Sequence, residues 1–317
     1  MDRRLALFLL LAPTLGHACM GIGEPAQAVR FAGQTNIVIW DGEREVEHFV
    51  RDAHFETRGK SLGFIAPSPT RPEIAAVSAA AFSTLAALSP RPAFGFSGGG
   101  LGGGGGLGGG GVSVVERKLV AGYEATVLKA SDAQALDVWM RFNGYAVPPF
   151  ATRWLAPYVR AGWYVTAFKV AAGDGQGATG PVRMSFRAAT PFNPYSVPPG
   201  NRGSGGLSLY FVSKGDETPK IGRTQSWIAP EWRAKIDDRT ASDLDAELNL
   251  GEASIPAGSS VRFYRDANFG RPGFDDLYFV AKAKTVQPAR LPGVFSVGGA
   301  LASLGVFAFV RVGRRSC

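Results

Sequence analysis

The sequence predicts an α+β fold with a mixed or mainly antiparallel sheet, a few helices and one C-terminal transmembrane helix. Alternating, strand-like segments outnumber amphipathic helical ones. The two kinds of segment are not regularly interleaved, which argues against a doubly wound parallel sheet. Residues 291–310 form an uncharged apolar stretch, and such a stretch is long enough to cross about 30 Å of hydrocarbon.

Residues 1–18 have the features of a signal peptide. Two arginines precede an apolar run, Leu5–Ala12, and small residues lead to Cys19. Cleavage there would leave Cys19 as the first residue of the exported domain. A second interpretation makes Cys19 the acylated cysteine of a lipoprotein, although Gly16 and His17 depart from the usual lipobox.

The exported domain, residues 19–290, opens with a hairpin signal. Gln34–Trp40 alternates in hydrophobicity, Asp41-Gly42 follows, and a second alternating run starts at Val46. Asp-Gly between two such runs favours a type I′ turn, whose two central residues both need positive φ. We therefore expect an antiparallel hairpin.

A short strand and a helix are expected next. Residues 62–69 read as a strand that ends in prolines, and Thr70 to Glu73 resembles a capping box. The helix would run to Ser89-Pro90. Its apolar face would consist of Ile74, Val77, Ala81, Leu85 and Leu88.

Residues 94–111 are dominated by glycine, which predicts a flexible loop. A phosphate-binding loop would end in Lys-Ser or Lys-Thr and lead into a helix. Here a strand-like run, 112–115, follows instead.

The remaining elements have local signals of the same kind. A capping-box pattern from Ser131 to Gln134 opens a second long helix, and Asn143-Gly144 supplies the residue of positive φ that ends it. A short helix is expected within 236–250. Strands are expected at 123–128, within 158–170, at 207–212 and at 277–281.

Charge and cysteine usage exclude some classes of protein. Five of the 34 Lys and Arg and one of the 26 acids lie in the terminal signals, which leaves +4 on residues 19–290. No basic cluster typical of a nucleic-acid surface is found. The two cysteines, Cys19 and Cys317, would lie on opposite sides of a membrane, so no disulfide is expected in the exported domain.

The exported sequence contains no marked catalytic, cofactor or metal motif, and we assign no such residue. A Ser-His-Asp hydrolase would have to use His48 or His54. Asp243 and Asp245 fit two positions of a calcium loop, but Leu248 stands where the EF-hand pattern requires glycine. We expect a solvated acidic surface there.

At the C-terminus, residues 291–310 would cross the membrane and 311–317 would be a basic cytoplasmic tail. Gly298 and Ala302 have the four-residue spacing that permits close pairing of two spans and hence a homodimer. An alternative is processing at a C-terminal sorting signal. Residues 291–293 begin like a sortase box but lack the threonine at which cleavage occurs.

Residues 122–145, with their Asn-Gly-Tyr ending, resemble the centre of the bacterial "domain of unknown function 2330" family. Residues 18–21, 64–69 and 158–170 are similar to smaller parts of it, and the resemblance extends over about residues 19–280. It implies an exported protein with a membrane segment near the C-terminus. It does not indicate any particular activity or functional residue. The chain departs from the family in lacking further cysteines and in its long glycine segment.

Together these observations predict a membrane-anchored cell-envelope protein whose exported domain is a non-enzymatic binding or scaffold domain. An envelope protein or a glycan would be its partner. The alternative is an extracytoplasmic hydrolase whose site is assembled from distant residues, with His48 or His54 in a cleft beside a carboxylate and a serine.

Overall fold

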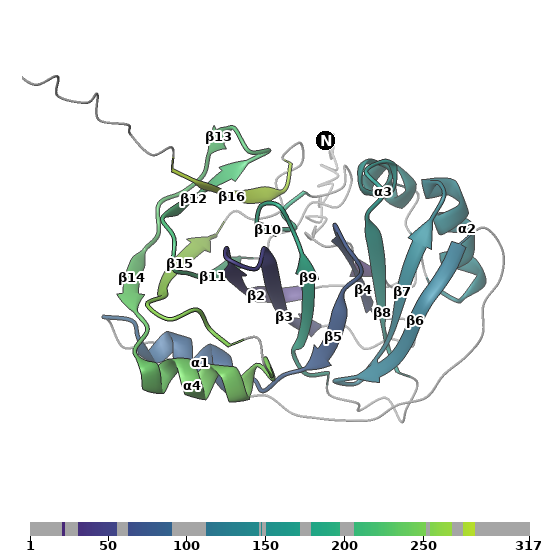
Figure 1. Cartoon of the computed structure of the whole chain (residues 1–317). Coiled ribbons are helices and arrows are strands. Elements are labelled where there is room, and N and C mark those ends of the chain that lie inside the picture. Colours follow the sequence, from purple (N-terminus) through teal and green to yellow (C-terminus); the bar gives the residue numbers. More distant parts are fainter. Residues whose placement is uncertain are drawn as a thin grey trace, which may run out of the picture. The chain divides into compact units, whose positions relative to one another are not determined.

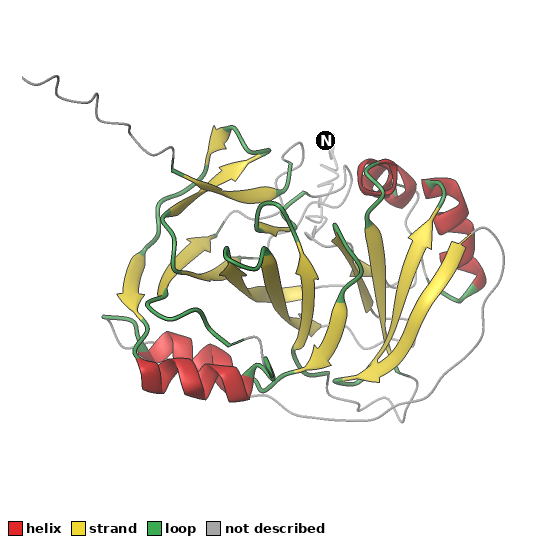
Figure 2. Ribbon diagram, viewed as in Figure 1, coloured by secondary structure: helices red, strands yellow, loops and turns green. Residues whose placement is uncertain are grey.

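The computed structural model describes residues 21–22, 31–55, 63–90, 112–145, 147, 150–171, 179–196, 206–251, 254–267 and 275–282. Four helices and 16 strands lie within these ranges, the strands in three sheets (Figures 1 and 2). This is the predicted α+β class. The predicted signal peptide 1–18, Cys19, the glycine segment 94–111, the predicted span 291–310 and the predicted tail 311–317 fall outside the described residues. In the described part of the chain, no helix is both long and apolar enough to cross a membrane.

The largest sheet has seven strands and mixed direction. Its neighbours are antiparallel except for one central parallel pair, β2 and β11, which come from distant parts of the sequence. In spatial order the strands are β14 (Trp232–Lys235), β15 (Ser260–Asp266), β11 (Leu207–Ser213), β2 (Phe31–Asp41), β3 (Val46–Phe55), β9 (Val182–Arg187) and β5 (Glu73–Ala76).

The other two sheets are antiparallel throughout. The five-stranded sheet has the order β1 (Gly21–Ile22), β4 (Gly63–Ser68), β8 (Tyr164–Val170), β7 (Tyr123–Ala130) and β6 (Val112–Val120). The four-stranded sheet has the order β10 (Phe192–Asn193), β16 (Leu277–Ala281), β12 (Glu217–Ile221) and β13 (Gln225–Ser226).

Two pairs of helices cover one face each of the two larger sheets (Figure 2). Helices α1 (Ala80–Ala87) and α4 (Asp238–Glu247) pack on the seven-stranded sheet, and α2 (Ala133–Phe142) and α3 (Ala151–Arg160) pack on the five-stranded sheet. The period of two along a strand explains this layering. In β2, Ile37 and Ile39 face the helices, whereas Val38 and Trp40 face the opposite side.

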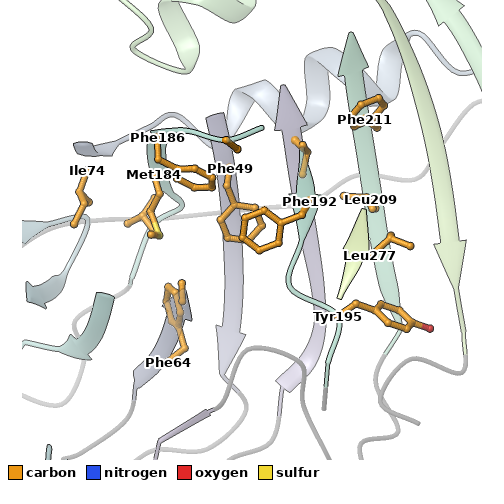
Figure 3. Close-up of a cluster of buried hydrophobic side chains, with 14 of the residues drawn as sticks. Phe49, Phe64, Ile74, Met184, Phe186, Phe192, Tyr195, Leu209, Phe211 and Leu277 are labelled. Atoms are coloured by element: carbon orange, nitrogen blue, oxygen red, sulfur yellow. The ribbon is translucent and has the colours of Figure 1, made fainter. Parts of the chain in front are cut away.

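The opposite faces of the sheets share a central core, part of which Figure 3 shows. Phe49 and Met184 reach it from the seven-stranded sheet, Phe64 from the five-stranded sheet, and Phe192 and Leu277 from the four-stranded sheet. Each of the two larger sheets is therefore buried on both faces over much of its area.

The predicted first hairpin is confirmed, but its turn is not the predicted two-residue type. Strands β2 and β3 pair up to Asp41 and Val46, with four residues between them. The Asp41 carboxylate accepts the backbone N–H groups of Glu43 and Arg44, each at 3.0 Å. Glu45, and not Gly42, takes positive φ, at 54°. The aspartate thus organises a longer turn by capping it.

The predicted helix from Thr70 is wrong in its first half. Residues 73–76 form strand β5, and only α1 is helical. The Thr70 hydroxyl donates to the Arg187 carbonyl and accepts the Arg187 N–H, both at 2.9 Å, so it extends sheet pairing and caps no helix. Pairing of β5 with β9 places Ile74 in the central core, and this tertiary burial overrides the local helical pattern.

Helix α2 is confirmed, with Asp132 as its N-cap in place of Ser131. Helix α3 was not predicted. Its apolar residues have helical spacing, but Pro157 lies inside it and removes one backbone donor. The predicted helix within 236–250 is confirmed as α4, and the strands predicted at 62–69, 123–128, 207–212 and 277–281 are present.

Buried hydrogen bonds join a short segment, 191–196, which contains β10 of the four-stranded sheet, to the seven-stranded sheet and to Asp276. Glu47 of β3 accepts the Phe192 N–H at 2.9 Å, and Asn36 of β2 donates to the Asn193 side chain at 2.7 Å. Asp276 accepts the N–H groups of Tyr195 and Ser196 at 2.9 and 3.0 Å. It also accepts the Tyr158 hydroxyl of α3 at 2.8 Å.

These contacts generate a prediction about Asp276. Asp276→Ala removes all three hydrogen bonds and should cost about 3 kcal/mol of unfolding free energy. Thermal melting of the full chain in one detergent should then show a midpoint lower by roughly 6–12 °C. Asp276→Asn retains an oxygen for the two backbone donors and should lose less than half as much. Equal midpoints for wild type and Asp276→Ala would contradict this role.

Candidate functional site

The helix-covered face of the five-stranded sheet is polar at one end. On this face β7 presents Glu124, Thr126 and Leu128, and Leu128 lies in the core beneath α2 and α3. The strand register places Arg117 of β6 opposite Thr126, and Lys169 of β8 opposite Glu124. Three charged side chains therefore gather where the apolar part of this face ends.

A β-bulge decides which residues of β6 share this face. Simple alternation would group Glu116 and Lys118 with Val114. The register shifts between Val114 and Glu116, so Arg117 and Leu119 take those places. The bulge thus brings an arginine to the side of the sheet on which α2 packs.

Helix α2 ends at the same place. Asn143 is its C-cap and Gly144 has a φ of +72°. The N–H groups of Gly144 and Tyr145 donate to the carbonyls of Arg141 and Met140, at 3.1 and 2.9 Å. This is a Schellman ending, and it confirms the predicted Asn-Gly helix stop. It also folds the Tyr145 ring back toward Trp139, with 5.9 Å between ring centroids.

The helix end and the polar strand residues enclose a cleft of about 270 Å³. Its lining comes from β6, β7, β8 and the end of α2, and combines two cations with one carboxylate and three aromatic side chains. The lining residues are Arg117, Glu124, Thr126, Trp139, Phe142, Asn143, Tyr145 and Lys169.

Asn143 holds both cations in place. Its side-chain oxygen accepts from Arg117 Nη2 at 3.1 Å, and its backbone carbonyl accepts from Lys169 Nζ at 3.3 Å. Lys169 therefore turns toward the carbonyl end of α2, a favourable position for a cation. Glu124 forms no ion pair with any described residue. The cleft consequently has one positive charge in excess.

Two donors at the cleft wall lack an acceptor among the described residues. They are Arg117 Nε and the indole Nε1 of Trp139, both buried. A buried donor without a partner costs about 1–3 kcal/mol. Both atoms are closed to solvent, so the preference of the cleft for an anion rests on the partly exposed cations Arg117 and Lys169.

The Tyr145 hydroxyl stays neutral across the physiological range. Burial raises its pKa to about 12. It can therefore donate or accept a hydrogen bond but carries no charge. The charges of the cleft are those of Arg117, Lys169 and Glu124.

Exposed apolar side chains surround this cleft. Phe142 and Val138, one turn apart on α2, are 77% and 56% exposed. Val114 and Leu119 are exposed on β6, on the same face as Arg117. In the described ranges these four are the exposed large hydrophobic residues. We call them, together with the cleft, the α2–β6 surface.

His48 lies elsewhere and is buried. It is 3% exposed, on the face of β3 that α1 and α4 cover, and its Nδ1 lies 2.7 Å from Ser185 Oγ in a hydrogen bond. Burial and the nearby Arg183 lower its pKa to about 4. The structure thus places a serine beside this buried histidine. The backbone of His54 lies in β3, but its side chain is outside the described residues.

Of the two acidic residues considered for calcium, Asp243 is exposed on α4 and Asp245 forms a hydrogen bond within the fold, next to the helix cap Asp237. Asp237 caps α4 by accepting the Thr240 N–H at 2.7 Å, and Asp245 accepts the Ile255 N–H at 2.7 Å. In the parts of the chain that the structure describes, no three His, Cys, Asp or Glu side chains form a metal-binding group.

The lowered pKa of His48 predicts acid sensitivity. The unfolded histidine binds a proton near pH 6.5, whereas the folded one does so near pH 4, so stability is lost as the pH falls through this interval. The contribution is about 3 kcal/mol at most. His48→Asn keeps an atom near Ser185 but does not titrate. The stability difference between wild type and variant, from urea titrations, should shrink between pH 7.5 and 4.5. A stability difference that stays constant over this pH range would refute the predicted acid sensitivity.

Comparison with curated proteins and with solved structures found no match. A family match covers residues 13–253, which include every residue of the cleft. The chain therefore belongs to the bacterial family described as "Uncharacterized protein conserved in bacteria (DUF2330)", the family that residues 122–145 indicated.

Proposed function

We propose that the chain is an exported, membrane-anchored protein of the bacterial cell envelope, and that residues 19–290 bind a partner through the α2–β6 surface. The observation that carries the binding role is the cationic cleft next to exposed apolar side chains of α2 and β6. Exposed apolar groups around convergent polar ones are typical of interaction sites.

The anchoring part of the proposal rests on the sequence. The signal-like residues 1–18 and the uncharged residues 291–310 support export with a retained C-terminal span. Arginines after the span favour a cytoplasmic tail, 311–317. Small residues in the span would let two copies pair, and acylation of Cys19 would add a second anchor.

Binding is favoured over hydrolysis by the setting of the His48–Ser185 pair. A hydrolytic pair needs access to substrate and an acid that orients the histidine. His48 is buried beneath helices, and the nearby Asp41 carboxylate is engaged by Arg44 at 2.9 Å. The α2–β6 surface, by contrast, is accessible.

Site-specific crosslinking in intact cells tests the binding role. A photoreactive p-benzoylphenylalanine in place of Phe142 should form an adduct with an envelope component, because this side chain projects from the proposed surface. The same group in place of Arg239, exposed on α4, is the matched control. No adduct at position 142 beyond that of the control would reject the binding role.

Protease protection tests the topology. Protease added to intact spheroplasts should digest residues 19–290 and spare a tag placed after Cys317. Intact mass of the mature protein checks retention of residues 291–317, which the sorting-signal alternative would remove. A domain protected in spheroplasts but digested after lysis would contradict export.

A further inference from the structure

We infer that the partner at the α2–β6 surface is a peptide segment of another protein, with a carboxylate side chain that enters the cleft and apolar side chains beside it. This inference rests on the proposed binding function and adds the chemical class of the ligand. Three features of the surface support it: the charge of the cleft, its size and the distribution of exposed apolar groups.

The positive charge of the cleft favours a carboxylate as the ligand group. Arg117 and Lys169 converge on the cleft, against the single carboxylate of Glu124. Arg117 Nη2 and Lys169 Nζ each donate a hydrogen bond to Asn143, and both cationic side chains stay partly exposed. A ligand carboxylate has two oxygens that accept such donors.

The size of the cleft is compatible with the entry of a side chain. The cleft measures about 270 Å³, below the roughly 300–1,000 Å³ of pockets that enclose a drug-sized ligand. An aspartate or glutamate side chain enters it and leaves room for a neighbouring group, and the rest of the ligand then lies on the adjacent surface.

That surrounding surface is apolar. Phe142 and Val138 stand one helical turn apart on α2, and Leu119 lies two residues from Arg117 along β6. Such neighbours are about 5–7 Å apart. An apolar side chain one or two residues from the acid in a peptide reaches them while the acid occupies the cleft.

A glycan fits this surface less well. Sugars stack on exposed aromatic faces, but Trp139 and Tyr145 are only 1% and 6% exposed. Phe142 is the one described aromatic ring of the cleft that is free to stack. An anionic membrane surface also fits less well, because the cleft is concave and carries the Glu124 carboxylate among its cations.

A random peptide library displayed against the full chain, in nanodiscs of neutral lipid, tests this inference. The enriched peptides should share one acidic residue flanked by apolar ones. A synthetic enriched peptide should bind at least about tenfold more tightly than the same peptide with its acid replaced by the corresponding amide.

Variants then place the peptide on the surface. Phe142→Ser changes a side chain that is 77% exposed. It should lower the affinity for the enriched peptide about tenfold without lowering the melting temperature of the protein. Arg117→Gln should lower the affinity by a similar factor. It should also abolish the preference for the acidic peptide over its amide counterpart. Arg239→Gln on α4 should leave affinity unchanged.

The inference is overturned if no motif is enriched, if the motif is basic, or if Phe142→Ser and Arg117→Gln bind the peptide like wild type. It is also overturned if crosslinking from position 142 yields only glycan or lipid adducts. That last result would preserve the proposed binding function, whereas the absence of any adduct would reject both.

Discussion

Burial of carboxylates against backbone N–H groups is the constraint on which the interior depends. Segment 191–196 contains only the two-residue strand β10, yet it lies among all three sheets. Its amide groups would be left without partners if Glu47 and Asp276 did not accept them. Both carboxyls are buried, and burial raises the pKa of each.

The candidate site follows from a mismatch between a helix and the sheet beneath it. Helix α2 has ten residues and ends at Asn143, whereas the strands below it continue beyond that point. Apolar strand residues occur under the helix and polar ones beyond it. The helix ending therefore supplies a wall, a carbonyl for Lys169 and an exposed Phe142 at one location.

Elements with local signals could be predicted from the sequence, and elements defined by distant contacts could not. The first hairpin, the Asn143-Gly144 helix stop and strand β16 have alternation or turn chemistry of their own. Strands β9 and β15 were not predicted, and they contain the charged residues Arg183 and Arg262. Both arginines are buried because distant carbonyls accept their donors, Leu248 for Arg183 and Glu217 for Arg262.

The site itself was beyond sequence reasoning for a related physical reason. Its side chains come from three strands and a helix, and a one-residue bulge in β6 determines that Arg117 faces the cleft. Alternation alone would have selected Glu116 and Lys118. The only local signal was the Asn-Gly-Tyr ending of α2, which marks the place where the helix stops and the cleft begins.

The parallel pairing of β2 with β11 has a consequence for the order of folding. These strands occupy the centre of the seven-stranded sheet, although more than half of the chain separates them. Contacts of such high sequence separation are slow to form, since a long loop must close before they contribute. Until β11 is synthesised, one edge of the hydrophobic strand β2 stays open to other chains. A nascent chain of this protein is thus open to aggregation for longer than a chain whose central strands are neighbours in the sequence.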